Sequence, residues 1–483
     1  MRCIITEFNH AQKWKYGSDP QPMAQATTDQ TESSDILSAS LWKAIPAFAF
    51  PVAATSILEQ LSNLIATVVI GQLSGPNGTM GMAAVGSNTP ITSLVLNLFI
   101  GISLGANVVI ANAIGRQDQR TVSRAVHTSI LMALAGVIVT IAGEIFAEPL
   151  LTLLNVPTET LPLAALYLRI YLIGMPAILL YNFESAILRS VGETQLPLHA
   201  LMISTVLSVL LDLLFVPVLG WGVAGVGIAT VISYSTSALI LFIRLLRIDS
   251  PVRVHIHELS LDGAVLRRIV RIGLPAGVQS AVFALANIII QAAINSLGTE
   301  VMAASSAAMS LEYVFYNLLN SFSQACTTFV GQNNGARNIV RCKRTLKVCL
   351  IEDGVVAAIT IAGVVFFGRS LLALFNGDPK IVAIGYIRVC SIFPAYVFSM
   401  CYENVSGYMR GFGISLLPAL LTMLGVCGIR FYWIAQVFPV HHTFRALMLV
   451  YPISLCATTL LVVGACIIVN PARSASRAIA RTR

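Results

Sequence analysis

Two stretches of the chain share one pattern: ILRSVGETQLP at residues 187–197 and YMRGFGISLLP at residues 408–418. Residues that the two stretches have in common, at one constant offset, include Arg189, Gly192 and Pro197 in the first and Arg410, Gly413 and Pro418 in the second. Further pairs at nearly the same offset are Pro51 with Pro275, Asn63 with Asn287, Gly115 with Gly335, and Arg169 with Arg388. This correspondence predicts that the chain consists of two halves with related structures.

The chain has the composition of a membrane protein. Of its 483 residues, 56% are hydrophobic and 11% are charged, and the mean hydropathy is +0.80, whereas about a quarter of the residues in a soluble domain are charged. The apolar residues fall in blocks of about 20 to 25, the length of helix that crosses about 30 Å of hydrocarbon. We expect twelve transmembrane helices, at residues 44–73, 82–112, 125–148, 160–188, 196–219, 222–245, 268–297, 302–330, 345–372, 380–407, 416–438 and 444–470.

The distribution of Lys and Arg predicts the orientation in the membrane. Most of these residues lie in the connections that follow even-numbered spans, whereas the connections after odd-numbered spans hold only Arg369, Lys380 and Arg445. Because positively charged loops stay in the cytoplasm, we expect a multi-pass protein of the cell (cytoplasmic) membrane with both termini cytoplasmic.

The repeat also predicts the domain organisation. Each half has an even number of spans, so the halves enter the membrane with the same orientation, and transporters built this way bind substrate between their lobes. We therefore expect an all-α polytopic membrane protein with two six-helix lobes, which favours a carrier over a channel. The expected parts are a disordered cytoplasmic tail at 1–40, an N-terminal lobe at 41–246, a cytoplasmic linker at 247–266, a C-terminal lobe at 267–470 and a basic cytoplasmic tail at 471–483.

Six segments in both halves resemble the multidrug and toxic compound extrusion (MATE) family. They are LSNLIATVVIGQLSG from Leu61, GANVVIANAIG from Gly105, ILRSVGETQLP from Ile187, GVAGVGIATVIS from Gly222, GLPAGVQS from Gly273 and VGQNNGAR from Val330. They occur in order and at the proper spacing over nearly the whole chain. The resemblance implies two six-helix lobes, a central cavity that faces one side of the membrane at a time, and export of organic, often cationic, compounds in exchange for protons or sodium ions.

The same resemblance implies a cation site in the first lobe. Family members carry a polar residue and an Asp in helix 5 and a Thr in helix 6, and this chain has Ser208, Asp212 and Thr230 at those positions. The family's Asp in helix 1 is replaced by Ala66. Glu59 lies two turns earlier on the same helical face, and it is the candidate to substitute for the missing carboxylate.

Acids in the second lobe are a further candidate for ion coupling. An ionisable group at midspan costs at least about 2.5 to 3.5 kcal/mol, so Glu312 in span eight and Glu403 in span ten each require a role. We expect them to form a coupled pair of carboxylates that exchanges protons. The alternative for each acid is a buried Arg partner or a polar cavity. Many family members carry a Glu in helix 7, where this chain has Phe283.

Polar and aromatic residues within the spans are candidates for lining a substrate cavity. Amides are costly against lipid, and a flat cation can stack on aromatic rings, although aromatic residues also serve in ordinary packing. The candidate cavity residues are Glu184, Asn63, Gln279, Asn287, Tyr313 and Tyr402. Glu184 occupies the repeat position of Glu403, and paired acids at one cavity would attract a cation.

Arginine, proline and glycine predict further features of the spans. We expect Arg169 and Arg388 to extend toward the membrane interface, and Arg430 to neutralise a carboxylate such as Glu403. Prolines that interrupt helices are expected at Pro51, Pro275, Pro176 and Pro394. Gly101 and Gly105 form a small-residue face for close helix packing.

The chain offers no enzyme motif. HExxH and a paired-Asp metal signature are missing from the sequence, and the nine Cys show no ligand spacing. We expect no catalytic residue, no metal site and no cofactor other than the coupling ion, H⁺ or Na⁺, with the proton preferred. The expected partners are small organic molecules and the lipid bilayer. We expect no nucleic-acid partner, and we expect the protein to be a monomer. The alternative function is a flippase for lipids or lipid-linked saccharides within the same fold superfamily.

Overall fold

The computed structural model describes residues 36–73, 78–154, 156–375 and 377–480, and every regular element in these ranges is helical. The helices of the first half are α2 (Leu41–Leu73), α3 (Gly78–Gly115), α4 (Gln119–Ala133), α5 (Gly136–Leu153), α6 (Leu161–Ile173), α7 (Met175–Ser190), α8 (Gln195–Phe215) and α9 (Gly222–Arg247). Those of the second half are α10 (Gly263–Asn295), α11 (Thr299–Gly335), α12 (Ile339–Ala373), α13 (Pro379–Ile392), α14 (Tyr396–Gly411), α15 (Leu416–Thr422), α16 (Ile429–Tyr432), α17 (Phe444–Met448), α18 (Val450–Val469) and α19 (Pro471–Ala480).

The predicted twelve spans are confirmed. In the described ranges, nine helices or helix series are long and apolar enough to cross a membrane, and two bent pairs, α6 with α7 and α13 with α14, add one span each. The twelfth span is α11, whose 37 residues include many Ser, Thr, Asn and Gln. These polar residues lower its hydropathy, which is consistent with a helix that faces protein and not lipid.

Proline bends some helices and leaves others continuous. The bent pairs turn by 46° between α6 and α7, next to Pro176, and by 43° between α13 and α14, at Pro394. By contrast, α2 contains Pro51 and α10 contains Pro275 without a break in the helix, so the predicted interruptions at these two prolines are wrong. Neighbouring helices make an internal proline tolerable in a membrane span.

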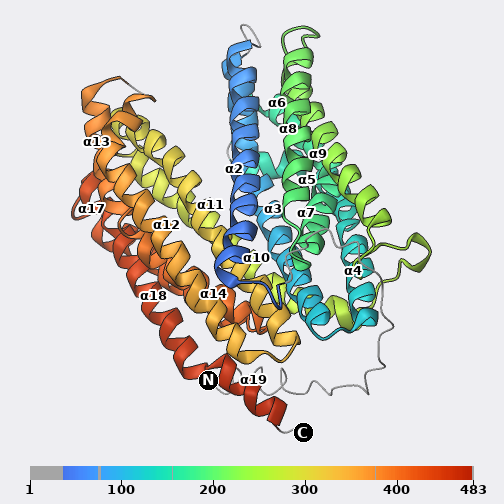
Figure 1. Cartoon of the computed structure of the whole chain (residues 1–483). Helices are drawn as coiled ribbons and strands as arrows, with labels where there is room; N and C mark the ends of the chain where they lie inside the picture. Colours follow the sequence, from blue (N-terminus) through green and yellow to red (C-terminus); the bar gives the residue numbers. More distant parts are fainter. Residues whose placement is uncertain (1–35, 74–77, 155, 376, 481–483) are drawn as a thin grey trace.

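The helices form two lobes that lean apart toward one end of the molecule and meet toward the other end, where α19 lies (Figure 1). Each lobe has its own hydrophobic core, but the beginnings of α2 and α10 are exchanged between the cores. Phe48 of α2 packs edge-on against Phe329 of α11, with ring centroids 5.7 Å apart. Val265 and Ile269 of α10 belong to the core of the first lobe. Helices α2 and α10 therefore connect the lobes mechanically.

Residues 36–40, which fall within the predicted disordered tail, are ordered against the start of α12. Arg341 at the start of α12 donates hydrogen bonds to the backbone oxygen atoms of Ile36, at 3.1 Å, and Ala39, at 2.5 Å. Ile36 is buried, so residues 36–40 belong to the folded body and only 1–35 of the predicted tail lie outside the described residues. At the other end, residues 471–480 of the predicted basic tail form α19, and 481–483 are outside the described ranges.

A tight seam joins the lobes at the end where they meet. A Cβ atom at Gly101 of α3 would overlap the backbone nitrogen of Gly277 of α10, and one at Gly105 would overlap the backbone oxygen of Ile269. The predicted small-residue face on this helix is thus confirmed. Close backbone approach of this kind allows two helices to pack with little space between them.

Burial along α3 and α11 shows where the seam begins. From Gly101 to Gly115 every residue of α3 is buried except Leu104 and Ile114, whereas the preceding part of the helix is mostly exposed or half-buried. In α11 the change occurs at Ser321, with Gln324 and Asn334 as the exceptions. These positions correspond through the repeat, so the two lobes contribute equivalent halves of equivalent helices to the seam.

Candidate functional site

The described residues of the seam include four side-chain hydrogen bonds that join the lobes. The Asn107 side chain accepts from Thr328 Oγ1 at 2.9 Å, and Asn112 Nδ2 donates to the Gly331 backbone oxygen at 3.2 Å. The other two bonds come from the end of α7: the Ser190 backbone oxygen accepts from Gln332 Nε2 at 2.6 Å, and Arg189 Nη1 donates to Gln324 Oε1 at 3.1 Å. All four involve the buried half of α11, so any separation of the lobes at this end must break them.

The first-lobe cation candidates lie on two adjacent helices. On α8, Ser208 is buried and Asp212 is 1% exposed, and Oδ1 of Asp212 has no hydrogen-bond partner in the described part of the chain. Thr230 of α9 is half-buried, and its hydroxyl donates to the Val226 backbone oxygen at 2.9 Å. Helices α8 and α9 pack against each other, but no hydrogen bond joins these three side chains within the described ranges.

Glu59 lies in a different polar environment from Asp212. It borders a small cavity between α2, α8 and α9, which is lined in addition by Ser62, Leu201, Ser204, Thr205, Ser233 and Tyr234. Periodicity predicted that Glu59 shares a helical face with position 66, but the serines and threonine of α8 and α9 around it were not predicted. Arg189 is close enough to Glu59 for the two charges to interact, although they form no hydrogen bond among the described residues.

Glu312 of α11 forms a buried ion pair with Arg388 of α13. Arg388 Nε lies 2.5 Å from Glu312 Oε1, and its Nη2 lies 2.8 Å from Oε2. The guanidinium also donates to Ser305 Oγ at 2.7 Å and stacks 5.5 Å from the centre of the Tyr451 ring. Arg388 is only 2% exposed, so the prediction that it extends to the membrane interface is wrong. Its repeat partner Arg169 does remain exposed, at 45%.

Glu403 of α14 pairs with a different arginine. Arg410, two turns further along the same helix, places Nη2 3.4 Å from Glu403 Oε2, and the Tyr316 hydroxyl is 3.5 Å from Oε1. Because each acid has its own arginine, the predicted direct pair of Glu312 and Glu403 is wrong. Arg430 does not pair with Glu403 either, since it donates to Asn287 Oδ1 at 3.2 Å and lies 4.4 Å from the centre of the Tyr451 ring.

Acidic side chains therefore lie inside both lobes, and the lobes are in close contact along the seam. The sequence pattern of the protein family described as MatE matches residues 51–214 and 275–433, one segment in each lobe. The chain belongs to the MatE family. The resemblance noted in the sequence is thereby confirmed at the level of the family.

Individual relatives agree with the MatE assignment. The "Probable multidrug resistance protein YoeA" of Bacillus subtilis is 25% identical over 81% of this chain and 86% of its own length. The "FAD transporter" of Shewanella oneidensis is 26% identical over 77% of this chain and 84% of its own length. A solved structure titled as the outward-facing conformation of a multidrug resistance MATE family transporter has a TM-score of 0.83 at 21% identity, covering 92% of this chain and 100% of its own. At this identity the structural likeness shows the fold.

One buried acid of this MatE protein was missed in the sequence. Asp353 of α12 is fully buried, and its Oδ2 accepts from Asn404 Nδ2 at 2.5 Å, while its Oδ1 has no partner in the described part of the chain. Asn404 follows Glu403 in α14, so this hydrogen bond connects Asp353 to the segment that carries Glu403. The signal was the adjacent pair Glu352 and Asp353 within an otherwise apolar span.

The predicted cavity residues of the MatE fold are distributed between accessible and buried positions. Asn63, Asn287 and Tyr313 are exposed. Gln279 is buried on α10, Tyr402 lies in the core of the second lobe, and Glu184 is 0% exposed with neither carboxylate oxygen hydrogen-bonded among the described residues. In this conformation only three of these six side chains are exposed on the surface of the protein.

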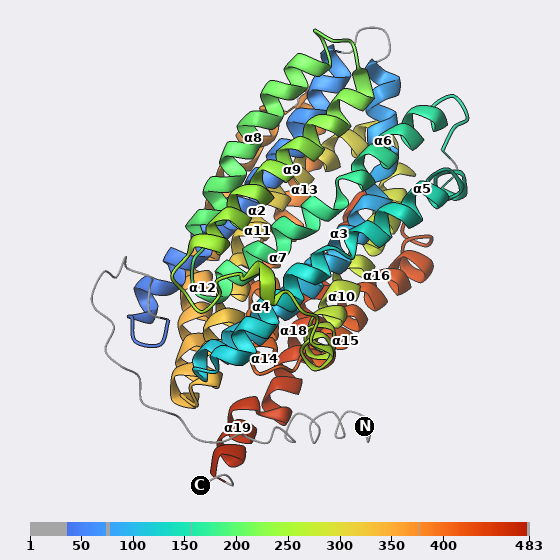
Figure 2. The same cartoon turned by 90° about the vertical axis from the view of Figure 1, so that its right-hand side faces the viewer.

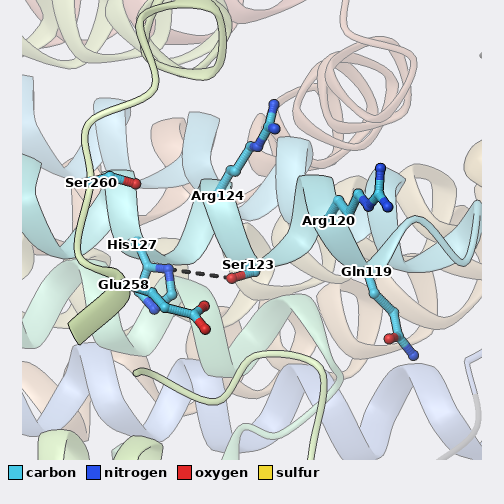
Figure 3. Close-up of a pocket in the computed structure, with 7 residues that line it drawn as sticks. All are labelled: Gln119, Arg120, Ser123, Arg124, His127, Glu258 and Ser260. Atoms are coloured by element: carbon cyan, nitrogen blue, oxygen red, sulfur yellow. Dashed lines mark hydrogen bonds between the residues drawn. The ribbon is translucent and has the colours of Figure 1, made fainter. Parts of the chain in front are cut away.

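One pocket of the described chain lies away from these acids. It has a volume of about 380 Å³ and lies between the start of α4 and the linker, where Arg120, Arg124, His127 and Glu258 line it (Figure 3). His127 Nε2 accepts from the His255 backbone nitrogen at 3.0 Å, so the neutral ring carries its proton on Nδ1, which faces Ser123 Oγ at 3.3 Å. These contacts attach the linker to α4.

Proposed function

We propose that this chain is a secondary active exporter that expels organic, cationic or amphipathic compounds in exchange for protons or sodium ions by alternating access. The observation that supports it best is the one-sided contact between the lobes. Four hydrogen bonds and a close α3–α10 crossing seal one end, whereas the equivalent outer halves of α3 and α11 are partly exposed. The names of the curated relatives, which include multidrug resistance proteins, support the direction of transport.

The sealed end is proposed to face the cytoplasm. The connections that leave the seam follow Gly115 and Gly335. They carry Arg116 and Arg337, and Arg120 lies at the start of the helix that follows the first of them. Positively charged loops are retained in the cytoplasm. The conformation is then open to the outside, with both chain ends cytoplasmic, and transport requires the seam to open while the outer ends of the lobes close.

Buried carboxylates are proposed to couple this movement to an ion gradient. Asp212 is buried with one oxygen free of hydrogen bonds in the described chain, and Glu403 and Asp353 form a second group of acids in the other lobe. A carboxylate inside a membrane domain is costly when charged and unpaired. Binding of a proton or a sodium ion removes this cost, so the preferred lobe arrangement can depend on ion occupancy.

The test is efflux of a fluorescent organic cation from proteoliposomes, with proton and sodium gradients imposed separately. We expect one of the two gradients to drive export, and Asp212→Asn or Glu403→Gln to abolish it. Flavin nucleotide and a lipid-linked saccharide are included as competing substrates. If neither gradient moves the cation while the lipid-linked substrate is translocated, the chain is a flippase and the exporter proposal is wrong.

A further inference from the structure

The pocket between α4 and the linker runs along one face of the helix. Arg120, Ser123, Arg124 and His127 lie on this face, and the linker contributes Glu258 (Figure 3). All the side chains that line the pocket are polar or charged, and its volume of about 380 Å³ is within the range of about 300 to 1,000 Å³ that is common for small-molecule sites. The pocket therefore has the size and polarity to hold a small charged group.

The two arginines of the pocket need a counter-charge. Arg120 and Arg124 are one helical turn apart, and like charges at this spacing destabilise a helix. Arg124 Nη1 lies 3.3 Å from Asp262 Oδ2, but the other oxygen of this carboxylate accepts from the backbone at the start of α10. Arg120 is exposed and forms no ion pair among the described residues. An anion held between the two guanidinium groups would remove their repulsion.

Ser123 has a free hydroxyl proton between these arginines and the linker. His127 Nε2 accepts from the His255 backbone nitrogen, so the neutral ring donates from Nδ1 to Ser123 Oγ at 3.3 Å. No oxygen atom accepts from the Ser123 hydroxyl among the described residues. A serine hydroxyl has one proton to donate. It is therefore available to a ligand oxygen, together with the donors of the two guanidinium groups.

The pocket lies at the depth of the lipid headgroups. The expected apolar span begins at Ala125, and Arg120 precedes it by five residues, about 7.5 Å along the helix. The polar layer on each side of the hydrocarbon is about 5 to 8 Å thick. The two arginines therefore extend from α4 within this layer, on the side of the membrane that is proposed to be cytoplasmic.

An apolar stripe continues the face of α4 that carries the arginines. Steps of three and four residues lead from Arg124 past the buried His127 to Leu131, Leu134 and Ile138, all within one candidate membrane span. Leu131 is half-buried, and Leu134 and Ile138 are exposed. A ligand with an anionic head and an acyl chain can contact both the pocket and this stripe, whereas a soluble anion can contact only the pocket.

We infer that the pocket binds the headgroup of an anionic phospholipid, of the phosphatidylglycerol type. A phosphodiester carries one negative charge and accepts hydrogen bonds from arginine and serine, and basic pockets on the cytoplasmic side of membrane proteins bind such headgroups. The acid in the pocket fits the same ligand, because the carboxylate of Glu258 can accept from the glycerol hydroxyls. The assignment to the cytoplasmic leaflet rests on the proposed orientation, but lipid binding itself does not depend on export.

The experiment is native mass spectrometry of the purified full-length protein in neutral detergent, titrated with phosphatidylglycerol, which resolves the lipid molecules bound to each chain. We expect Arg120→Gln to weaken binding of the first lipid about tenfold, equivalent to about 1.4 kcal/mol, and Ser123→Ala to weaken it severalfold. Arg344→Gln is the matched control. Arg344 is the repeat counterpart of Arg124, at the offset that relates Gly115 to Gly335, and it is exposed outside the pocket.

Competing ligands distinguish the lipid from other sources of the same chemistry. Phosphatidylethanolamine has the same phosphodiester but no net charge, and glycerol phosphate has a similar head without acyl chains. We expect neither to displace phosphatidylglycerol at equal concentration. If glycerol phosphate displaces it as well as unlabelled lipid does, the pocket takes soluble phosphates and the lipid inference is wrong. Equal binding of phosphatidylethanolamine would show that the arginines do not select for charge, which also contradicts it.

The variants decide whether the lipid binds at this pocket. If Arg120→Gln and Ser123→Ala bind phosphatidylglycerol like the wild type, or if Arg344→Gln weakens binding as much as Arg120→Gln, the inferred site is wrong. The melting temperature of each variant without lipid shows whether it is folded. Because no measurement here uses transport, loss of the lipid site leaves the exporter proposal standing, and failure of export leaves the lipid site standing.

Discussion

Arg189 of the first lobe donates a hydrogen bond to Gln324 of the second lobe at 3.1 Å, whereas its repeat counterpart Arg410 binds Glu403 within its own lobe. The same residue type at the same position of the repeat therefore has two roles. One arginine joins the lobes, and the other neutralises a buried acid. Of these two arginines, only the one in the first lobe therefore carries its charge directly to the seam.

Replacement of Gln324 by Glu should hold the seam closed. A carboxylate at this position gives Arg189 a charge-assisted partner, which is roughly twice as strong as a neutral hydrogen bond. An added stabilisation of about 1.4 kcal/mol shifts the equilibrium between closed and open seams about tenfold. We expect the initial rate of export from proteoliposomes to fall by about the same factor, while the melting temperature of the purified protein does not decrease.

The control for this variant is Asn317→Asp, which makes the same change of amide to acid on the same helix. Asn317 lies before the buried half of α11, and its Nδ2 donates to the Tyr313 backbone oxygen at 2.9 Å. It should therefore leave the seam unaffected. Export by Gln324→Glu at the rate of this control would show that the Arg189 bond does not limit the movement of the lobes.

Loss of the Glu312 carboxylate should destabilise the second lobe strongly. Glu312→Gln leaves the guanidinium of Arg388 buried without its counter-charge, and removal of one partner of a buried ion pair costs about 3 to 5 kcal/mol. The measurement is the melting temperature of the purified protein. The double variant Glu312→Leu with Arg388→Met should recover much of the loss, because an apolar pair needs no counter-charge.

The repeat provides the comparison for this pair. Arg169 is the counterpart of Arg388, but it is 45% exposed and its nearest carboxylate oxygen atoms, in Glu144 and Glu148, are 3.7 and 3.9 Å away. Exposed ion pairs contribute about 1 kcal/mol or less. Arg169→Gln should therefore barely change the melting temperature, and an effect as large as that of Glu312→Gln would contradict the assignment of Arg388 as the buried member.

The contrast between these arginines shows what could be predicted from the sequence. Span length and the internal repeat predicted the twelve helices and two lobes, because both depend on local composition. The repeat could not predict which arginine is buried. That depends on the acid at position 312, which is present in the second lobe alone. Similarly, periodicity placed Glu59 on the correct face of α2, but the cavity around it depends on how α8 and α9 pack.

Gly101→Ala should push α3 and α10 apart. The added Cβ would overlap the backbone nitrogen of Gly277, and backbone atoms cannot move aside as a side chain can. Overpacking of this kind costs about 1 to 3 kcal/mol, so we expect a lower melting temperature and a weaker seam. Gly86→Ala on the same helix is the control, because a Cβ there has no atom within 4 Å apart from its own helix and chain neighbours. Equal stability of the two variants would contradict the close crossing.

The start of α10 should lose stability in acid through Asp262. Its carboxylate accepts from the backbone nitrogen atoms of Ala264, at 2.9 Å, and Val265, at 3.1 Å, and lies 3.3 Å from Arg124 Nη1. The Val265 hydrogen bond is the largest cause that lowers the pKa of Asp262 below its usual value, with Ala264 and Arg124 adding to it. A carboxylate with a lowered pKa stabilises the fold above its unfolded pKa, and this contribution is lost as the pH falls through the folded value.

Two substitutions separate the helix cap from the ion pair at this position. Asp262→Ala removes both and should cost about 1 kcal/mol at neutral pH. Asp262→Asn keeps an oxygen that can accept from the backbone and loses only the charge, so its cost should be smaller, because an exposed ion pair contributes little. In the wild type, this carboxylate contributes part of the fall in melting temperature in acid. Both variants should lack that part. If the melting temperature of Asp262→Ala falls with acid as steeply as that of the wild type, another group is responsible for the pH dependence.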